Sequence, residues 1–262
     1  MRIAVCIKQV PDTEARLRVS KDGRWLDEAD LPYVINESDE FALEEAIRIA
    51  ESTAGEVVVI SLGPDRVRES LRKALALGAA RAVLLKDEAF CGGDALATGR
   101  ALAAAIRQEG VELVLTGSQS DDLGWGSTAS IVAAELGWPH AWLVMGVGVE
   151  SGSLRLVREM ESGKNEIFRT SLPAVVEVQA GINHPRYASL KGIMAAKKKE
   201  IAEKSPADLG LDPAVLGLSG SRVEVLSVAA PEVGQGAVMI GGDAVSAAKE
   251  LVEKLRREAR VL

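Results

Sequence analysis

Residues 112–128 read ELVLTGSQSDDLGWGST, a compact apolar run that leads into a long polar loop containing three glycines. An apolar run of this length is typical of a strand that is covered on both faces. The residues that follow, STASIVAAELG (127–137), have helical spacing and end at Gly137, as many helices do. The stretch therefore predicts one strand–loop–helix unit of a parallel sheet.

The same alternation runs through the first half of the chain. Further strand-like runs lie at 2–10, 57–62 and 82–85, and helix-like segments lie at 41–51, 67–78 and 95–110. Repeated β-α units of this kind predict a doubly wound, mostly parallel sheet with helices on both faces.

The pattern changes after residue 140. Alternating runs at 142–150, 154–160 and 166–172 predict added β-hairpins, and 174–181 predicts a return to the sheet. Residues 200–221 are rich in Pro and Gly and predict an extended connection, followed by a short strand (222–229) and a helix (243–260). We expect a nucleotide-binding α/β domain over 1–199 and a C-terminal arm over 200–262.

Composition narrows the function. The 262 residues are 47% hydrophobic and carry a net charge of −7, which argues against a general nucleic-acid binder. Neither Cys6 nor Cys91 has a nearby Cys or His at the spacing typical of metal ligands, so no metal site is expected. With only two cysteines, a reduced, cytoplasmic setting is favoured. The apolar run 3–7 is too short for a signal peptide, and no stretch approaches the ~18 apolar residues that span a bilayer.

Residues 117–128, here named the nucleotide loop, lie at a strand's carboxyl end, where open α/β sheets bind ligands. Ser127 and Thr128 offer hydroxyls to a phosphate at the helix start, and Asp121 and Asp122 offer carboxylates to a ribose or an adenine amine. The alternative is a solvated turn that merely caps the helix. The length and position of the loop favour a nucleotide site.

Two other segments point to the same ligand. INESDE (35–40) supplies Asn36 and Ser38, either as helix N-caps or as ligand contacts, and SLGP (61–64) ends a neighbouring strand run. Three strand-end loops are therefore expected to converge on one small anionic ligand.

Dinucleotide and catalytic interpretations are weaker. GWGSTA (124–129) satisfies G-x-G-x-x-A, but a Rossmann fingerprint opens the first β-α turn, which here is the glycine-free 8–16. His140 and His184 are far apart in sequence, and no Ser or Cys lies in a nucleophile motif. The chain is expected to be a binding protein without catalytic residues.

Residues 186–199, RYASLKGIMAAKKK, place positive charge beside an apolar helical face in an acidic protein. Leu190, Ile193 and Met194 fall at i, i+3 and i+4, on one side of a helical turn. This patch either caps the protein's own core or is offered to a partner.

Several stretches together resemble the β subunit of electron-transfer flavoproteins, with coverage to about residue 210. They are AVCIKQVPD (4–12), NESDEFALEEAIRI (36–49), SLGPDRVRESLRKALALGAARAV (61–83), TGSQSDD (116–122), LPAVVEVQAGINHPRYASLKGIMAAKKK (172–199) and PADLG (206–210). WPHA (138–141) and NESDEF (36–41) are most similar to bacterial β subunits that pair with amine dehydrogenases.

The resemblance implies a heterodimer whose α subunit holds the redox-active FAD, while the β subunit binds a structural AMP. It places the AMP contacts at Cys6, Asn36, Glu37, Ser38, Asp39, Leu62, Gly117, Ser118, Gln119, Ser120, Asp121, Asp122, Leu123, Gly124, Trp125, Gly126, Ser127 and Thr128. Two departures bear on these contacts. Asn36-Glu37-Ser38 replaces the family's Asn-Pro-Phe or Asn-Pro-Tyr, and the usual Ala-Ile-Asp after Gln119 is missing.

The resemblance also implies that residues 186–199 are a docking segment for partner dehydrogenases, which donate electrons. A quinone-reducing or other acceptor is then expected to take the electrons onward. Leu190 is the expected anchoring residue, with the lysines at the rim, whereas Ile193 and Met194 are expected to pack on the sheet. Arg186 is expected near the flavin or the subunit interface. The docking residues are Arg186, Tyr187, Leu190, Lys197, Lys198 and Lys199.

Three alternatives stay open. A bifurcating relative would hold a second FAD in place of AMP. A free-standing nucleotide sensor of the universal-stress type would need no α subunit and would leave 200–262 unexplained. An ATP pyrophosphatase of similar fold would need an N-terminal S-G-G-x-D-type phosphate loop, which the chain lacks.

Overall fold

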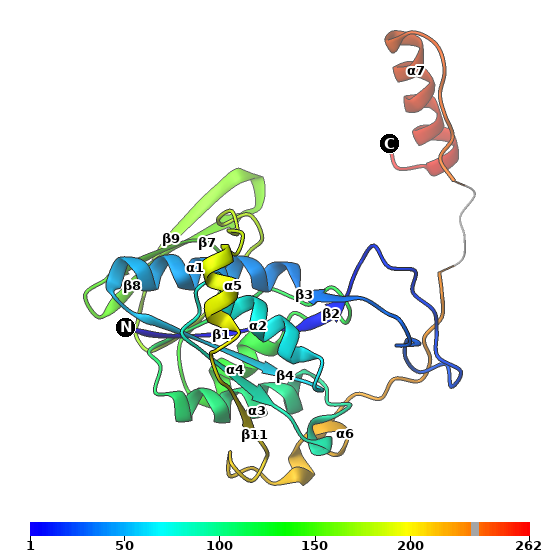
Figure 1. Cartoon of the computed structure of the whole chain (residues 1–262). Helices are drawn as coiled ribbons and strands as arrows, with labels where there is room; N and C mark the ends of the chain where they lie inside the picture. Colours follow the sequence, from blue (N-terminus) through cyan, green and yellow to red (C-terminus); the bar gives the residue numbers. More distant parts are fainter. Residues whose placement is uncertain (232–235) are drawn as a thin grey trace. The chain divides into compact units, whose positions relative to one another are not determined.

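A nine-stranded sheet is the centre of the chain's α/β part (Figure 1). The computed structural model describes residues 1–231 and 236–262. In sheet order the strands are β11 (Ile201–Lys204), β5 (Arg81–Leu85), β4 (Glu56–Leu62), β1 (Arg2–Cys6), β6 (Leu113–Gly117), β10 (Ala174–Val178), β7 (His140–Glu150), β8 (Ser153–Met160) and β9 (Lys164–Ser171). The first seven are parallel, and β7–β9 form an antiparallel meander.

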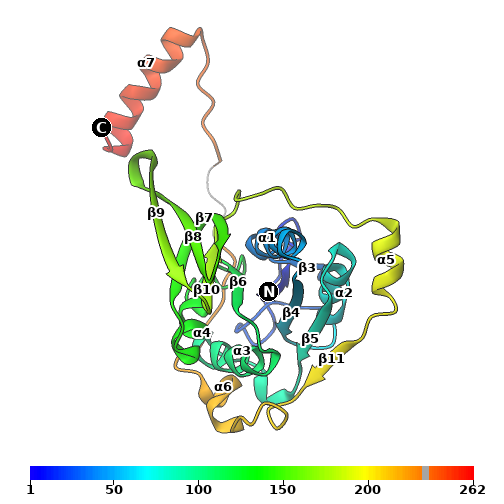
Figure 2. The same ribbon diagram turned by 90° about the vertical axis from the view of Figure 1, so that its left-hand side faces the viewer.

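Helices cover both faces of the sheet (Figure 2). Side chains of α1 (Glu37–Thr53) and α2 (Val67–Leu77) share one buried apolar cluster with Ile3 and Val5 of β1. Side chains of α3 (Ala95–Glu109) and α4 (Thr128–Leu136) share the other cluster with Ala4. Alternate residues of β1 therefore face opposite layers, as strand geometry requires. The doubly wound α/β fold is confirmed.

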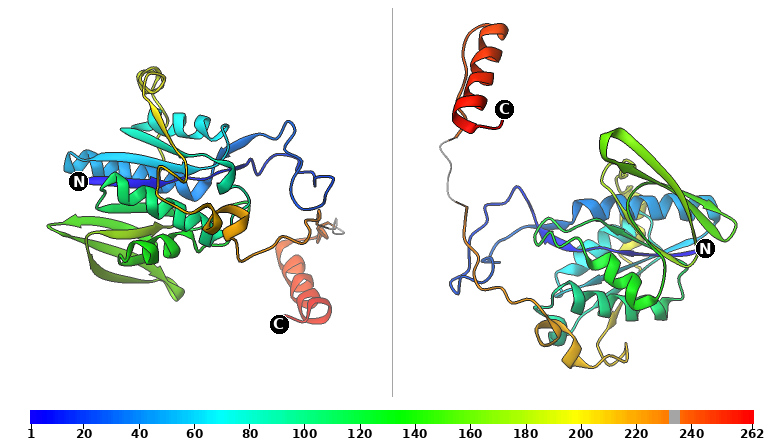
Figure 3. Two further views of the ribbon diagram at one scale, coloured as in Figure 1. Left: turned by 90° about the horizontal axis from the view of Figure 1, so that it is seen from below. Right: turned by 180° about the vertical axis from the view of Figure 1, so that it is seen from behind.

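The antiparallel strands β7–β9 lie at one edge of the sheet (Figure 3). They confirm the predicted hairpins, with Leu154 and Leu156 of β8 fully buried. The predicted strand 2–10 is wrong in its second half, because β1 ends at Cys6 and Gln9–Pro11 forms β2, which pairs antiparallel with β3 (Tyr33–Ile35). The reason is local: the Lys8 N–H donates to the Asp39 carboxylate (2.8 Å) instead of to a neighbouring strand.

Residues 200–221 are more ordered than an extended connection. Ile201 is buried, and its strand β11 extends the parallel sheet beside β5. Leu209 and Leu216 are buried in the α3–α4 layer, and the short helices η3 (Pro213–Val215) and α6 (Gly217–Gly220) follow. Burial of these three apolar side chains outweighs the turn-forming Pro and Gly content. The expected strand over 222–229 is absent from the described residues.

The chain divides into two units, residues 1–17 with 27–226 and residues 18–26 with 227–262. The second unit contains α7 (Ala244–Lys254), which is capped by the Asp243 carboxylate and continued by the π-helical turn η4 (Leu255–Ala259). This confirms the predicted terminal helix. Residues 232–235 of the predicted arm lie outside the described residues. Within the described chain, no helix has both the length and the apolar character needed to cross a membrane.

Candidate nucleotide site and docking segment

The strand-end segments that were predicted to converge lie together in the structure, while their binding of one small anionic ligand stays a prediction. Strands β4, β1 and β6 are neighbours and run parallel, so Leu62, Cys6 and Gly117 lie at one edge of the sheet. The segment before α1 joins them, because Asn36 donates to the Gln119 carbonyl (2.8 Å) in the nucleotide loop. Residues far apart in sequence therefore form one polar surface at the carboxyl edge.

Side chains at the start of α1 hold the nucleotide loop in place. Asn36 is fully buried; its Oδ1 accepts from the Asp121 N–H (2.9 Å), and Ser38 Oγ donates to the Gln119 carbonyl (2.8 Å). The Asp121 carboxylate in turn accepts from the Glu37 N–H (3.3 Å). Asn36 is the N-cap residue of α1, but in the described chain its side chain makes no capping hydrogen bond. Asn36 and Ser38, expected as helix N-caps or as ligand contacts, thus connect the start of α1 to the nucleotide loop.

Asp39 is a buried carboxylate behind this surface. Its two oxygens accept from the Lys8 N–H (2.8 Å) and the Gly117 N–H (3.0 Å). Burial raises the pKa of Asp39 to about 7, against the opposing effect of those hydrogen bonds. Gly117 is required here by space: a Cβ on it would lie 2.2 Å from Ser38 Oγ and 2.5 Å from Asp39 Oδ1.

Lys8 closes one side of the nucleotide loop. Its ammonium pairs with Asp122 (2.6 Å) and lies 3.4 Å from Ser120 Oγ. This ion pair occupies the carboxylate of Asp122, which was expected to contact a ribose or an adenine amine. Lys8 was not singled out from the sequence, although its place directly beyond a buried strand was a usable signal.

The start of α4 is the open part of the loop. Gly124 and Gly126 have φ of 63° and 57°, which side chains other than glycine rarely adopt. Ser127 is the N-cap residue, and within residues 1–231 and 236–262 its side chain makes no capping hydrogen bond. Because the first N–H groups of a helix lack intrahelical acceptors, this end presents donors and a partial positive charge.

The remaining expected contacts are apolar or exposed. Cys6 is buried, and burial raises the pKa of its thiol to about 12, so the side chain is a neutral part of the wall. Leu62 is half-buried at the end of β4, Leu123 is half-buried in the loop, and Trp125 is 37% exposed.

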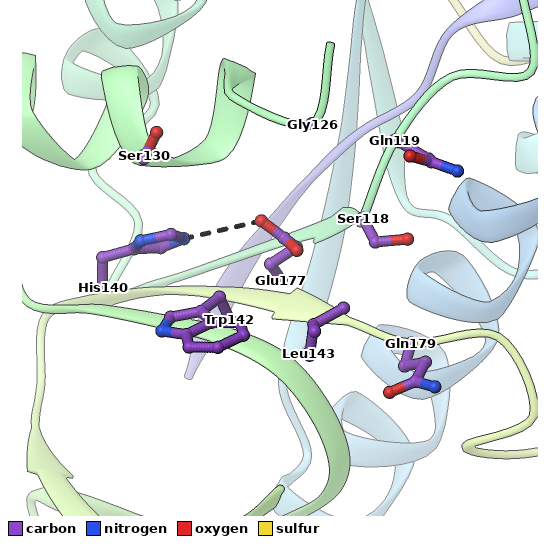
Figure 4. A pocket seen from close by; sticks show the side chains of 9 residues that line it. All are labelled: Ser118, Gln119, Gly126, Ser130, His140, Trp142, Leu143, Glu177 and Gln179. Atoms are coloured by element: carbon purple, nitrogen blue, oxygen red, sulfur yellow. Dashed lines mark ion pairs between the residues drawn. The ribbon is translucent and has the colours of Figure 1, made fainter. Parts of the chain in front are cut away.

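A pocket of about 610 Å³ opens beside the nucleotide loop (Figure 4). Its lining residues are Ser118, Gln119, Gly126, Ser130, His140, Trp142, Leu143, Glu177 and Gln179. Glu177 is in register with Thr116 of β6, which is in register with Cys6 of β1, so these three side chains form one row across three strands. This row was not predicted from the sequence. Its signal was a lone carboxylate in the apolar run AVVEV (174–178).

Electrostatics in the pocket are unusual. Burial raises the pKa of Glu177 to about 7 and, together with Arg158, lowers the pKa of His140. His140 Nε2 lies 3.8 Å from the Glu177 carboxylate, beyond hydrogen-bond distance, and Figure 4 shows the two side chains pointing toward each other. Among the described residues, neither His140 Nε2 nor Thr116 Oγ1 has a hydrogen-bond partner. The pocket therefore has unused hydrogen-bonding capacity at His140, one of its lining residues.

The docking segment (186–199) contains the short helix α5 (Leu190–Ala196). Tyr187 is 98% exposed and Leu190 is 83% exposed, as expected for Leu190. The expectation that Ile193 and Met194 pack on the sheet is wrong: they are 41% and 62% exposed. The reason is that Gly192, not the apolar side chains, makes the close contact of α5 with α2.

The basic residues of the docking segment differ in their exposure and in their hydrogen-bond partners. Lys197 and Lys198 are exposed, whereas Lys199 donates to the Ala79 carbonyl (2.6 Å). Arg186 is paired with Glu44 (2.9 Å) and Glu51 (2.6 Å) of α1. Arg186 thus lies against this chain's own helix.

Comparison with known proteins identifies the family. The family model "Electron transfer flavoprotein domain" matches residues 24–209. "Electron transfer flavoprotein subunit beta" of Methylophilus methylotrophus is 44% identical over 253 residues, which cover 95% of this chain and 96% of that protein. Proteins of the same name from Thermoanaerobacterium thermosaccharolyticum and Bradyrhizobium diazoefficiens are 39% and 38% identical, covering 97% and 100% of this chain and 98% and 100% of their own lengths. The chain, as its motifs indicated, belongs to the family of electron transfer flavoprotein β subunits.

Proposed function

We propose that this chain is the non-catalytic subunit of a heterodimeric electron carrier: it binds AMP structurally, supports the FAD of an α subunit and docks dehydrogenases. The observation that carries the proposal is the nucleotide loop, tied to α1 by Asn36 and Ser38 and open at the start of α4. The redox chemistry is supplied by the FAD, held mainly by the α subunit.

The site suits a small nucleotide with a phosphate. The phosphate would bind at the N–H groups and hydroxyls of Ser127 and Thr128, next to Gly124 and Gly126, whose φ angles are positive. Cys6 and Leu62 supply an apolar wall at the ends of β1 and β4. In this arrangement Asn36, Ser38 and Asp39 act mainly by fixing the loop, because their polar atoms already bond within the chain.

The nucleotide is tested by denaturing the assembled heterodimer and analysing what is released. Mass spectrometry should find AMP beside one FAD per heterodimer. Recovery of two FAD molecules would instead assign the bifurcating function, and the neighbouring pocket of about 610 Å³ provides room for a ligand larger than AMP. Recovery of FAD alone, with no second nucleotide, would refute the AMP proposal.

The α subunit is the proposed partner of the arm (200–262). In α7, Val245 and Leu251 are 64% and 48% exposed, so the helix offers an apolar surface to another chain. A chain ending after Ser221 keeps β11, Leu209 and Leu216 and should fold, yet it should no longer copurify with the α subunit. Normal assembly of that truncated chain with the α subunit would contradict the proposed role of the arm in binding the α subunit.

We propose that the docking segment binds the electron donor, a dehydrogenase, and that a quinone-reducing or other acceptor takes the electrons onward. Exposed Tyr187 and Leu190 would fill a pocket of the donor, and Lys197 and Lys198 would attract its acidic rim. A cytoplasmic location is proposed because both cysteines, in the described chain, are free thiols.

A further inference from the structure

We propose that Arg186, through its pairs with Glu44 and Glu51, is a positioning residue that fixes the docking segment in the conformation presenting Leu190. This inference rests on the proposed docking function. The guanidinium spans two carboxylates on one face of α1. It donates to both oxygens of Glu44 (2.9 and 3.1 Å) and to both oxygens of Glu51 (2.6 and 3.0 Å).

The two carboxylates have different surroundings. Glu44 is buried, and it also accepts from the Arg186 backbone N–H (3.2 Å), so it fixes the main chain as well as the side chain. The side chain of Glu51 is 59% exposed and lies two turns further along α1. A planar guanidinium that pairs with two carboxylates at once has one orientation, which lysine could not reproduce.

The residues before Arg186 are held to the same helix. Asn183 donates to the Phe41 carbonyl (3.1 Å) and to the Glu45 carboxylate (3.0 Å). The chain is therefore fastened to α1 at two points before it reaches Tyr187.

The other end of the docking segment is fastened to α2. Arg72 donates to the carbonyls of Ala196 and Lys199, and a Cβ on Gly192 would lie 2.3 Å from the Ala76 carbonyl oxygen. The seven-residue helix α5 is too short to be stable by itself, and Leu190 and Met194 bury little surface. Its conformation must come from these contacts rather than from a core of its own.

This arrangement has a consequence for recognition. A segment that is already ordered loses less conformational freedom when a partner binds than a mobile one does. Loosening the Arg186 contacts should therefore weaken donor binding while Leu190 itself stays intact.

The experiment compares Glu51→Gln and Arg186→Lys with Glu112→Gln in the holo heterodimer. Glu112 is an exposed carboxylate just before β6, so it controls for the loss of one negative charge. The donor dehydrogenase is used as reductant in one assay and dithionite in the other. We expect KM for the donor to rise roughly two- to tenfold in both test variants, with kcat and dithionite reduction unchanged. Amide hydrogen exchange over 187–196 should become faster in the test variants only.

The outcomes separate this inference from the docking function itself. If Leu190→Ala raises KM but neither test variant does, or if Glu112→Gln raises it equally, positioning by Arg186 is refuted and docking stands. If Leu190→Ala leaves KM unchanged, the docking function fails and the positioning role fails with it. Should Arg186→Lys not assemble, Glu51→Gln alone decides, because an exposed ion pair contributes little to folding stability.

Discussion

Gly117→Ala should destabilise the chain more than its single added methyl group suggests. Gly117 ends β6 directly against the first turn of α1, where a Cβ would lie 2.2 Å from Ser38 Oγ and 2.6 Å from the Ser38 carbonyl carbon. The second of these atoms is backbone, so the clash cannot be relieved by rotating a side chain. Either the end of β6 or the start of α1 must move.

The expected cost has two parts. Overpacking a close contact costs about 1–3 kcal/mol. Movement of β6 would also lengthen the hydrogen bond from the Gly117 N–H to buried Asp39 (3.0 Å), and losing a bond to a charged acceptor costs about 1.5–3 kcal/mol. Together these predict a loss of about 2.5–6 kcal/mol, a large share of the ~5–15 kcal/mol that stabilises a typical domain.

Urea unfolding followed by circular dichroism measures this loss, and, under the proposed AMP-binding function, AMP retained after gel filtration measures the loop's integrity. Gly148→Ala is the matched control, because a Cβ there meets its nearest atom, the Arg155 carbonyl oxygen, at an ordinary 3.6 Å. The control should change stability by less than ~1 kcal/mol and should retain AMP. Wild-type stability and AMP content in Gly117→Ala would show that α1 and β6 are not packed as described.

Three further outcomes follow from the structure. Leu190→Ala should leave the melting temperature nearly unchanged because the side chain is 83% exposed, whereas Leu71→Ala, at a fully buried position, should cost about 2–5 kcal/mol; equal melting losses would place Leu190 in a core. The pKa of Glu177 is about 7 in the folded chain, above its ordinary value of 4.5. The contribution of this group to the free energy of unfolding is therefore fully present below pH 4.5 and is lost as the pH rises through 7. Between pH 5 and 8 the free energy of unfolding should therefore decrease less in Glu177→Gln than in the wild type. An equal decrease in both proteins would contradict the raised pKa. Lys197→Gln combined with Lys198→Gln should slow flavin reduction by the donor at low salt and have little effect at high salt; a salt-independent change would exclude electrostatic steering.

The sequence predicted the parallel sheet well because its signals are local. Apolar runs such as 57–62, and glycines such as Gly137 after a helix, act within a few residues. The edge strand β11 was missed because 201–204 has little sequence signature, and its place depends on Ile201 packing beside a strand more than a hundred residues earlier.

The candidate site was predictable in position but not in its internal bonding. A strand-end loop entering a helix predicts where a ligand binds, and the family motifs are the basis for proposing AMP. No spacing rule connects Asn36 to Gln119 or Lys8 to Asp122, since those contacts exist only once three loops are brought together. Glu177 and His140 were missed for the same reason, because their proximity follows from the pairing of β10 with β7.

The docking segment joins β10 to β11, and between these two strands the sheet order places β6, β1, β4 and β5. It therefore crosses the outside of the α1–α2 layer as a strap fastened at both ends, with Tyr187, Leu190 and Met194 facing outward. None of these three side chains contributes much to the core, so mutation can exchange them without a folding penalty. Under the proposed docking function, natural variants could then acquire a different electron donor by altering the outer surface of the strap alone, while the proposed nucleotide site and the sheet stay under separate selection.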